Sequence, residues 1–318
     1  MVLIAMPFKG LELSRQYFLE TAMPRLRLDF PELFPRLAAG LVGNGSECFG
    51  YDDETSRDHD WGTDFYLWVQ EADRSRIPEL EQWKRTLMTF TPPAFPRQRS
   101  EYGAIVRVMT CADFYKQLVG VPDVPQDILQ WFRMPENNLA MCVNGEVFMD
   151  NAGEFSAIRN RFLQHYPEDY RKKKISAKCM AIAQTGQYNL RRMAARGEAV
   201  TVYTTIARFI DAVTGLVFLL NRVYRPYYKW ENRALRELPV LGKEVGVLLE
   251  QLVSQCGLSA AVLAQQEDIV SEICRLLHAE LKNQGLTGSE DWFFSTHGEE
   301  VRSRIAHQVL RSLPATYE

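Results

Sequence analysis

The stretches GNGS (residues 43–46) and DHD (residues 58–60) decide the fold of this chain, and eleven residues separate them. A Gly-Ser turn can bring backbone N–H groups and a hydroxyl close to phosphate oxygens. Two carboxylates at positions i and i+2 of a strand point to the same face about 7 Å apart, so they can share divalent cations. Together the two stretches predict a site for a metal-bound nucleoside triphosphate.

The composition is that of a globular protein with room for two domains. The chain has 318 residues, of which 46% are hydrophobic and 24% are charged, so each domain can bury its own core. A net charge of −3 argues against a surface that tracks nucleic acid along its whole length and leaves only a local basic groove. The six cysteines lie far apart without a C-x-x-C pair, which argues against a zinc ribbon or a disulfide scaffold.

Targeting and membrane signals are weak. The apolar start at residues 1–6 has no basic region before it, and Lys9 and Glu12 follow soon after, which is not typical of a signal peptide. The apolar run at residues 212–220 is bounded by Asp211 and by Arg222 and is too short to span a bilayer. We therefore expect a cytoplasmic protein without a membrane partner.

The pattern changes from mixed to helical along the chain. Prolines break the helices expected between residues 11 and 39. Strands are predicted at 61–69, 102–109 and 145–149, and helices at 77–88 and 113–119. Beyond residue 170 only helices are predicted, at 170–196, 202–222, 241–256, 260–284 and 298–313. This order predicts a domain of residues 1–165 and a helical domain of residues 166–318, with the triphosphate site in the cleft between them.

The two opening stretches resemble the hG[GS] … Dh[DE]h signature of the nucleotidyltransferase superfamily related to DNA polymerase β. His59 departs from this signature, which usually has an apolar residue there, and we expect it to pack against the sheet. A closer resemblance is to the bacterial DUF4037 family, whose members look like kanamycin-nucleotidyltransferase-type enzymes with an appended helical domain. The stretches that carry it are GSE (45–47), GYDDE (50–54), SRDHDW (56–61), GEVFMD (145–150), QYNLR (187–191) and PYYKW (226–230).

The resemblance implies an α+β fold, with an N-terminal polymerase β-like mixed sheet and helices followed by an all-helical C-terminal domain. It also implies a nucleotidyltransferase that uses Mg²⁺ or Mn²⁺ and moves a nucleoside monophosphate from an NTP, with ATP as the expected donor, to a hydroxyl of a small molecule. A nucleic acid acceptor is the less favoured reading, and a homodimer is compatible with the family. The alternative function is a catalytically silent module that binds a nucleotide or a regulatory partner.

Three carboxylates are the candidate metal ligands. Asp58 and Asp60 would bind ions that bridge the phosphates, and Asp150, at the end of an apolar strand, would complete the second metal site or help to deprotonate the acceptor. The alternative for Asp150 is a turn residue before Asn151. Asp113 and Glu154 are weaker candidates because both suit the start of a helix.

The candidate phosphate ligands are Gly45 and Ser46 in the turn and three cations in the helical half. Lys178 and Arg191 follow a basic run, and Lys229 lies between two aromatic residues that could stack on a base. The alternative for all three cations is a solvated or snorkelling side chain. We expect the acidic run at residues 52–54 to form a solvated turn outside the site.

Overall fold

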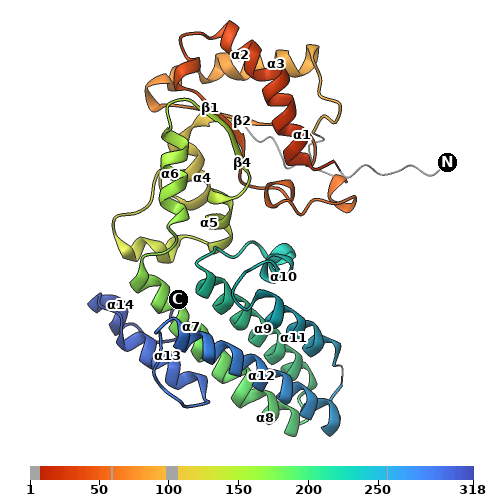
Figure 1. Ribbon diagram of the computed structural model, residues 1–318, viewed down its shortest axis with the longest axis vertical. Helices are drawn as coiled ribbons and strands as arrows, with labels where there is room; N and C mark the ends of the chain where they lie inside the picture. Colours follow the sequence, from red (N-terminus) through yellow and green to blue (C-terminus); the bar gives the residue numbers. More distant parts are fainter. Residues whose placement is uncertain (1–7, 59, 98–106, 256) are drawn as a thin grey trace, which may run out of the picture. The chain divides into compact units, whose positions relative to one another are not determined.

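The computed structural model describes residues 8–58, 60–97, 107–255 and 257–318. The chain forms two compact units (Figure 1), which are treated one at a time. The first unit comprises Met1–Gln126 with Arg133–Gln164, and the second comprises Asp127–Phe132 with His165–Glu318. A short segment in the middle of the first unit's sequence therefore belongs to the second unit.

The first unit is built on a mixed four-stranded sheet with the order β3-β2-β1-β4. The strands are β1 (Ala38–Leu41), β2 (Tyr66–Val69), β3 (Val108–Thr110) and β4 (Glu146–Asp150). Strand β1 is antiparallel to both β2 and β4, while β2 and β3 are parallel. Gly40 is required in β1, because a Cβ there would lie 2.4 Å from the carbonyl oxygen of Glu146.

Both faces of this sheet are covered, as the alternation along β2 predicts. Phe65, Leu67 and Val69 belong to the apolar core beneath the N-terminal helices. On the opposite face, the ring of Trp68 stacks on that of Phe155, with 3.7 Å between ring centroids. All residues of β2 are buried, so this strand is rigidly held in the middle of the unit.

Helices lie on either side of the sheet (Figure 1). They are α1 (Gly10–Tyr17), a π-helical turn (Phe18–Ala22), α2 (Met23–Asp29), α3 (Ile77–Phe90), α4 (Cys111–Val119), α5 (Glu136–Val143) and α6 (Glu154–Leu163). Pro24 lies at the start of α2, directly after the π-helical turn.

In its described residues the second unit consists of helices joined by loops, without a strand. Its helices are α7 (Glu168–Ile182), α8 (Leu190–Ala195), α9 (Ala199–Asn221), α10 (Tyr228–Arg236), α11 (Gly242–Ser254), α12 (Ala260–Asn283), α13 (Phe294–Ser303) and α14 (Gln308–Ser312). Helix α7 packs against α9 and α13. Among the described helices, α9 is long and apolar enough to cross a membrane, but 67% of its most apolar window is buried in the unit, as in a core helix.

A seven-residue π-helix, Ala183–Asn189, joins α7 to α8. Gly186 lies inside it, and a Cβ at this position would come within 2.5 Å of the Phe209 ring on α9. The absence of a side chain therefore lets Phe209 pack directly against the helix backbone. The wide turn is a feature that the 3.6-residue period of the sequence does not reveal.

The expected fold class, an α+β sheet unit followed by a helical region, is confirmed. Three local expectations are wrong. The strand predicted at 61–69 begins only at Tyr66, residues 38–39 belong to a strand instead of a helix, and the helix predicted at 298–313 is divided into α13 and α14. Of the strand predicted at 102–109, residues 102–106 lie outside the described part of the chain.

Candidate functional site

The Gly-Ser turn leaves the sheet directly after β1. Gly43 and Gly45 have φ values of 107° and 133°, a region that glycine enters far more readily than other residues. Asn144 holds the turn from the side, since its side-chain amide accepts from the Gly43 N–H and donates to the Gly43 carbonyl, both at 2.8 Å. Ser46 follows, half-buried, and its carbonyl accepts from the N–H groups of Phe49 and Tyr51. The turn is thus fixed by its own backbone contacts.

Asp58 and Asp60 lie in the irregular segment that leads into β2. Asp58 ends a short 3-10 turn, Thr55–Arg57, and is exposed. Asp60 has a left-handed backbone with φ of 50°, which Asp tolerates better than most residues. The expectation that the two carboxylates share one face of a strand is therefore wrong. His59 lies outside the described residues.

Arg97 joins the Gly-Ser turn to the aspartate segment. One of its terminal nitrogens donates to the backbone carbonyl of Asp60, and the other donates to the carboxylate of Glu47, the residue after Ser46. The side chains of Arg97 and Glu47 are 6% and 1% exposed. A buried, charge-assisted pair of this kind fixes Arg97 against Glu47, so the residue after Ser46 and the backbone at Asp60 are joined through one side chain.

Glu47 also explains the strict need for glycine at position 45. A Cβ on Gly45 would lie 2.6 Å from a carboxylate oxygen of Glu47. The carboxylate of Glu47 is therefore folded back beneath the turn, where the Arg97 guanidinium balances its charge.

Asp52 corrects the expectation of a solvated acidic turn at residues 52–54. It is only 4% exposed, and its carboxylate accepts from the Gly10 N–H at 2.8 Å and from the Trp61 indole N–H at 2.9 Å. Lys9 lies 3.4 Å away as an ion-pair partner. Asp53 and Glu54 are exposed as expected. Asp52 thus ties the start of α1 to the segment that carries Asp58 and Asp60.

Asp64, just before β2, forms a buried three-charge cluster with two cations. Its carboxylate lies 2.6 Å from the Lys84 ammonium and 2.8 Å from the Arg107 guanidinium. Burial alone would raise the pKa of Asp64, but the two cations outweigh this effect and hold the pKa at about 2. The carboxylate is therefore ionised at neutral pH and stabilises the fold through its two ion pairs.

Asp150 does not lie with Asp58 and Asp60. It pairs with Ala38, at the start of β1, whereas the Gly-Ser turn follows the end of β1, about 10 Å further along the strand. Its carboxylate accepts from the N–H groups of Gly153 at 2.9 Å and Ser156 at 2.7 Å. These contacts support the alternative reading, in which Asp150 stabilises the turn into α6.

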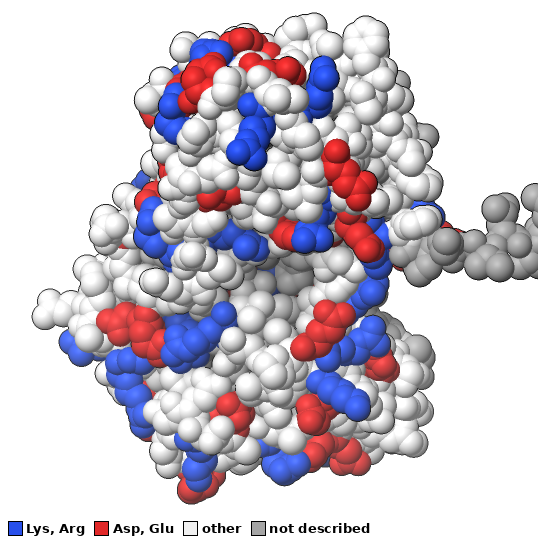
Figure 2. All heavy atoms as spheres, turned by 45° about the horizontal axis from the view of Figure 1, so that its top comes forward, with Lys and Arg blue, Asp and Glu red and all other residues white. Residues whose placement is uncertain are grey.

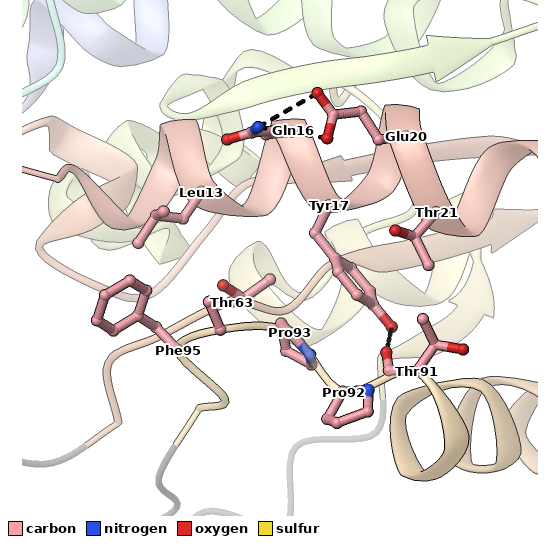
Figure 3. A pocket seen from close by; sticks show the side chains of 11 residues that line it. Leu13, Gln16, Tyr17, Glu20, Thr21, Thr63, Thr91, Pro92, Pro93 and Phe95 are labelled. Carbon is pink, nitrogen blue, oxygen red and sulfur yellow. Dashed lines mark hydrogen bonds between the residues drawn. The ribbon is translucent and has the colours of Figure 1, made fainter.

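A cavity of about 260 Å³ lies beside the aspartate segment in the first unit (Figure 3). Its walls come from α1, from the π-helical turn after it, from Thr63 and from residues 91–95. The Tyr17 hydroxyl donates to the Thr91 carbonyl at 2.7 Å, and the Gln16 amide donates to Glu20. Among the described residues that line the cavity, Glu20 alone is charged. The lining suits a neutral or cationic small molecule better than an anion.

The three predicted cations of the second unit lie on three different helices. Lys178, on α7, is 7% exposed, and its ammonium lies 2.5 Å from the Glu318 carboxylate. Arg191, on α8, has a side chain that is 83% exposed, and it lines a cavity of about 150 Å³ with Glu267 and Trp292. Lys229 is exposed at the start of α10 and lies over the Trp230 ring, 5.5 Å from its centroid. The structure does not gather them around one ligand within this unit.

The surface and the metal-binding groups add two observations. On the face drawn in Figure 2, Lys and Arg are interspersed with Asp and Glu. In the part of the chain that the structure describes, no group of three or more His, Cys, Asp or Glu side chains is placed to hold a metal ion.

Sequence reasoning missed Arg97, Glu47 and Asp52 as parts of this site. Glu47 stands directly beside the GS pair, so its position was a usable signal. Arg97 is 50 residues from Glu47, and no local pattern could have identified it as the partner.

Comparison with known proteins gives two matches of different weight. A solved structure, the nucleotidyltransferase-like protein from Exiguobacterium sibiricum 255-15, has 14% sequence identity and a TM-score of 0.35, with 85% of this chain and 81% of that chain covered. At that identity and score, no residue role is taken from it. No curated protein matches the chain.

The second match is to a protein family. The family model of DUF4037, a domain of unknown function, matches residues 131–231. The matched stretch runs from the segment that precedes α5, through β4 and α7, to the start of α10. The resemblance to DUF4037 noted from the sequence is confirmed over these residues.

Proposed function

We propose that the protein is a Mg²⁺-dependent nucleotidyltransferase that moves a nucleoside monophosphate from an NTP to a hydroxyl of a small molecule, in the cytoplasm. The observation that carries the proposal is the Arg97 bridge between Glu47 and Asp60. It holds a glycine turn of phosphate-binding type next to a segment with two carboxylates. That combination has a clear use in handling a metal-bound triphosphate.

The roles of the residues follow from their chemistry. The amides of Gly45 and Ser46, with the Ser46 hydroxyl, would hold the β- and γ-phosphates. Asp58 and Asp60 offer the hard oxygen donors that Mg²⁺ prefers, and the ion would supply charge neutralisation on the phosphates when bound. The acceptor hydroxyl would attack the α-phosphorus and lose its proton to solvent, the bond from the α-phosphorus to the oxygen that bridges to the β-phosphate would break, and pyrophosphate would leave.

The cavity beside Thr63 is the proposed acceptor site. Its single carboxylate, Glu20, would repel the phosphates of the donor. The cavity would therefore exclude the triphosphate and accept a neutral or cationic acceptor. Its volume of about 260 Å³ is at the lower end of small-molecule sites, which favours a small acceptor over a macromolecule.

The first test is a screen of the four NTPs with Mg²⁺ by thermal shift, followed by measurement of pyrophosphate release with candidate acceptors. We expect Asp58→Asn and Asp60→Asn to abolish release and to leave the melting temperature of the ligand-free protein unchanged or raised, because neutralising one of two neighbouring acids relieves repulsion. Asn also tolerates the left-handed backbone at position 60.

Asp53→Asn is the matched control, since it removes one charge from the same loop and can keep the hydrogen bond from the Ser56 N–H to Oδ1. Retention of most activity by Asp58→Asn would show that the metal assignment is wrong. Binding of an NTP by the wild type without transfer to any acceptor would favour the silent nucleotide-binding module instead.

A further inference from the structure

The basic run of α7 is buried in the second unit, and this is an unusual place for lysines. Lys174 and Lys178 are one helical turn apart and are 9% and 7% exposed. Gly215 makes room for the second of them, because a Cβ there would lie 2.8 Å from the Lys178 side chain. Two like charges on one buried face are unfavourable unless an anion lies between them.

The anion that the structure provides is Glu318, which lies 140 residues further along the chain than Lys178. Its carboxylate is 2.5 Å from the Lys178 ammonium and 3.9 Å from the Lys174 ammonium. The Glu318 side chain is 30% exposed, whereas those of the two lysines are 11% and 8% exposed. The carboxylate therefore sits at the solvent side of the site, with the ammonium groups beneath it.

The surroundings of the lysine pair include one carboxylate besides Glu318 and two aromatic rings. Asp211 lies 3.9 Å from Lys178 but is also paired with Arg225 at 2.6 Å, so its charge is shared. The rings of Tyr166 and Tyr170 lie 5.6 and 6.0 Å from the Lys174 ammonium, as in cation–π contacts. Without Glu318, Lys174 and Lys178 would lose the carboxylate that lies within 4 Å of both ammonium groups.

Glu318 is brought to the site by a short segment, residues 313–318. The Lys173 ammonium donates to the backbone carbonyls of Leu313 and Pro314, and the ring of Tyr317 lies against that of Phe132 with 5.2 Å between centroids. Tyr317 itself is 52% exposed. The Glu318 side chain is itself 30% exposed, so an anion in solution could compete with it.

We propose that Lys174 and Lys178 form a phosphate-binding site in the second unit and that the Glu318 carboxylate occupies this site as an internal competitor. The ligand class is a phosphate-type oxyanion, because ammonium groups on flexible chains are effective point-charge partners of phosphates. The inference concerns binding within the helical unit and does not depend on the proposed transferase activity.

The test measures binding of sodium pyrophosphate to the full chain by isothermal titration calorimetry, in EDTA and at constant ionic strength. Without a divalent cation, Asp58 and Asp60 cannot help to bind the probe. We expect Glu318→Gln to tighten pyrophosphate binding about tenfold or more, which corresponds to about 1.4 kcal/mol. The matched control is Glu290→Gln, which removes an exposed carboxylate paired with Lys282 in the same unit and should leave the affinity unchanged.

The second variant shows where the gain arises. Adding Lys178→Met to Glu318→Gln should abolish the gain, and Lys174→Gln replaces Lys178→Met if circular dichroism shows that the first double variant is unfolded. The proposal is overturned if Glu318→Gln binds pyrophosphate no more tightly than Glu290→Gln does, or if the gain persists in a folded double variant.

Discussion

Asp64 shows how one buried carboxylate depends on its neighbours. Its pKa is lowered from the ordinary value of 3.8 to about 2, since the Lys84 and Arg107 charges outweigh the effect of burial. A carboxyl group whose pKa is lower in the folded state stabilises the fold above its unfolded pKa, and this contribution is lost as the pH falls through the folded value. The relevant window therefore runs from about pH 4 down to about pH 2.

The first prediction concerns this window. We expect the free energy of unfolding to fall by about 2 kcal/mol from the Asp64 contribution between pH 4 and pH 2, and Asp64→Asn should remove that part of the fall. At pH 7 the same variant should cost about 3–5 kcal/mol, because Lys84 and Arg107 stay buried without their anion. Urea unfolding at a series of pH values measures both effects.

Asp123→Asn is the control for Asp64→Asn. Asp123 forms an exposed ion pair with Arg161 in the same unit, so its loss should cost at most about 1 kcal/mol. Equal costs for the two variants would contradict the structural role of Asp64.

The second prediction separates the two readings of Asp150. Because its carboxylate accepts two backbone N–H groups at the turn into α6, Asp150→Ala should lower the stability by about 1–2 kcal/mol. Its rate of nucleotide transfer, measured below the melting temperature, should match that of the wild type. A loss of transfer as complete as that of Asp58→Asn, with unchanged stability, would restore Asp150 to the metal site.

Residue-level prediction from the sequence succeeded where the neighbours in sequence carry the information. The glycines of the turn have the positive φ values that a Gly-rich turn predicts, whereas Asp58 follows a 3-10 turn and not a strand. Asp52 was misjudged because its partners, Gly10 and Trp61, come from two other segments. Lys178 was predicted as a phosphate ligand, but its partner Glu318 is 140 residues away and could not be recognised from spacing.

At the scale of the element, the Gly-Ser turn and the short helix after it contain positions where the backbone favours glycine. Gly45 and Gly50 both have positive φ values, 133° and 72°. A Cβ at Gly45 would meet the Glu47 carboxylate at 2.6 Å, whereas a Cβ at Gly50 would meet nothing within 4 Å. The two positions therefore differ in steric contact although both require an unusual backbone.

The third prediction compares alanine at these two glycines. Gly50→Ala should cost about 1–2 kcal/mol, the ordinary penalty of a left-handed alanine. Gly45→Ala should cost more, because the Glu47 carboxylate and its partner Arg97 must also move, and it should weaken NTP binding in the thermal-shift assay. The measurement is urea unfolding of both variants, and a Gly45→Ala cost no larger than that of Gly50→Ala would contradict the role of Glu47.

Element prediction from the sequence located α9, α11 and α12 of the second unit, but it missed α10, merged α13 with α14 and began β2 too early. The alternation of Phe65, Leu67 and Val69 identifies the buried strand, but the residues before it do not continue the extended backbone. Gly62 has a φ of 126°, and a Cβ there would lie 2.8 Å from the Arg97 backbone. The aspartates consequently sit in a loop, where a two-residue period has no meaning.

At the scale of the whole molecule, the chain enters the second unit at Asp127, goes back to the first unit at Arg133, and enters the second unit again at His165. The short segment Asp127–Phe132 contributes Trp131, which is 1% exposed and packs edge-on against Tyr166 with 5.4 Å between ring centroids. The helical unit therefore depends on a residue that precedes α5 and β4. A boundary drawn once along the sequence cannot represent this arrangement.

The fourth prediction follows from Trp131. We expect Trp131→Ala to destabilise the second unit by about 3–5 kcal/mol and to reduce hydrogen-exchange protection in α7, with β1 and β2 unchanged. Trp83→Ala is the matched control, since Trp83 packs edge-on against Phe30 within the first unit and should affect α2 and α3 instead. Loss of protection in β1 and β2 of Trp131→Ala would contradict the assignment of this segment to the second unit.

The fold class was accessible from the sequence because it depends on the order of strand and helix patterns. The assignment of residues 127–132 was not accessible, because it depends on which core accepts a tryptophan and not on any periodicity.

The π-helix Ala183–Asn189 has a consequence for how this chain can change by insertion and deletion. A π-helical turn holds one residue more than an α-helical turn, so this stretch already contains the kind of extra residue that an insertion would add. Loss of one residue within it would restore a regular α-helix and leave α8, with Arg191 beside Trp292, in its orientation. Loss of one residue within α7 has no wide turn to compensate for it and would turn every following side chain by about 100°.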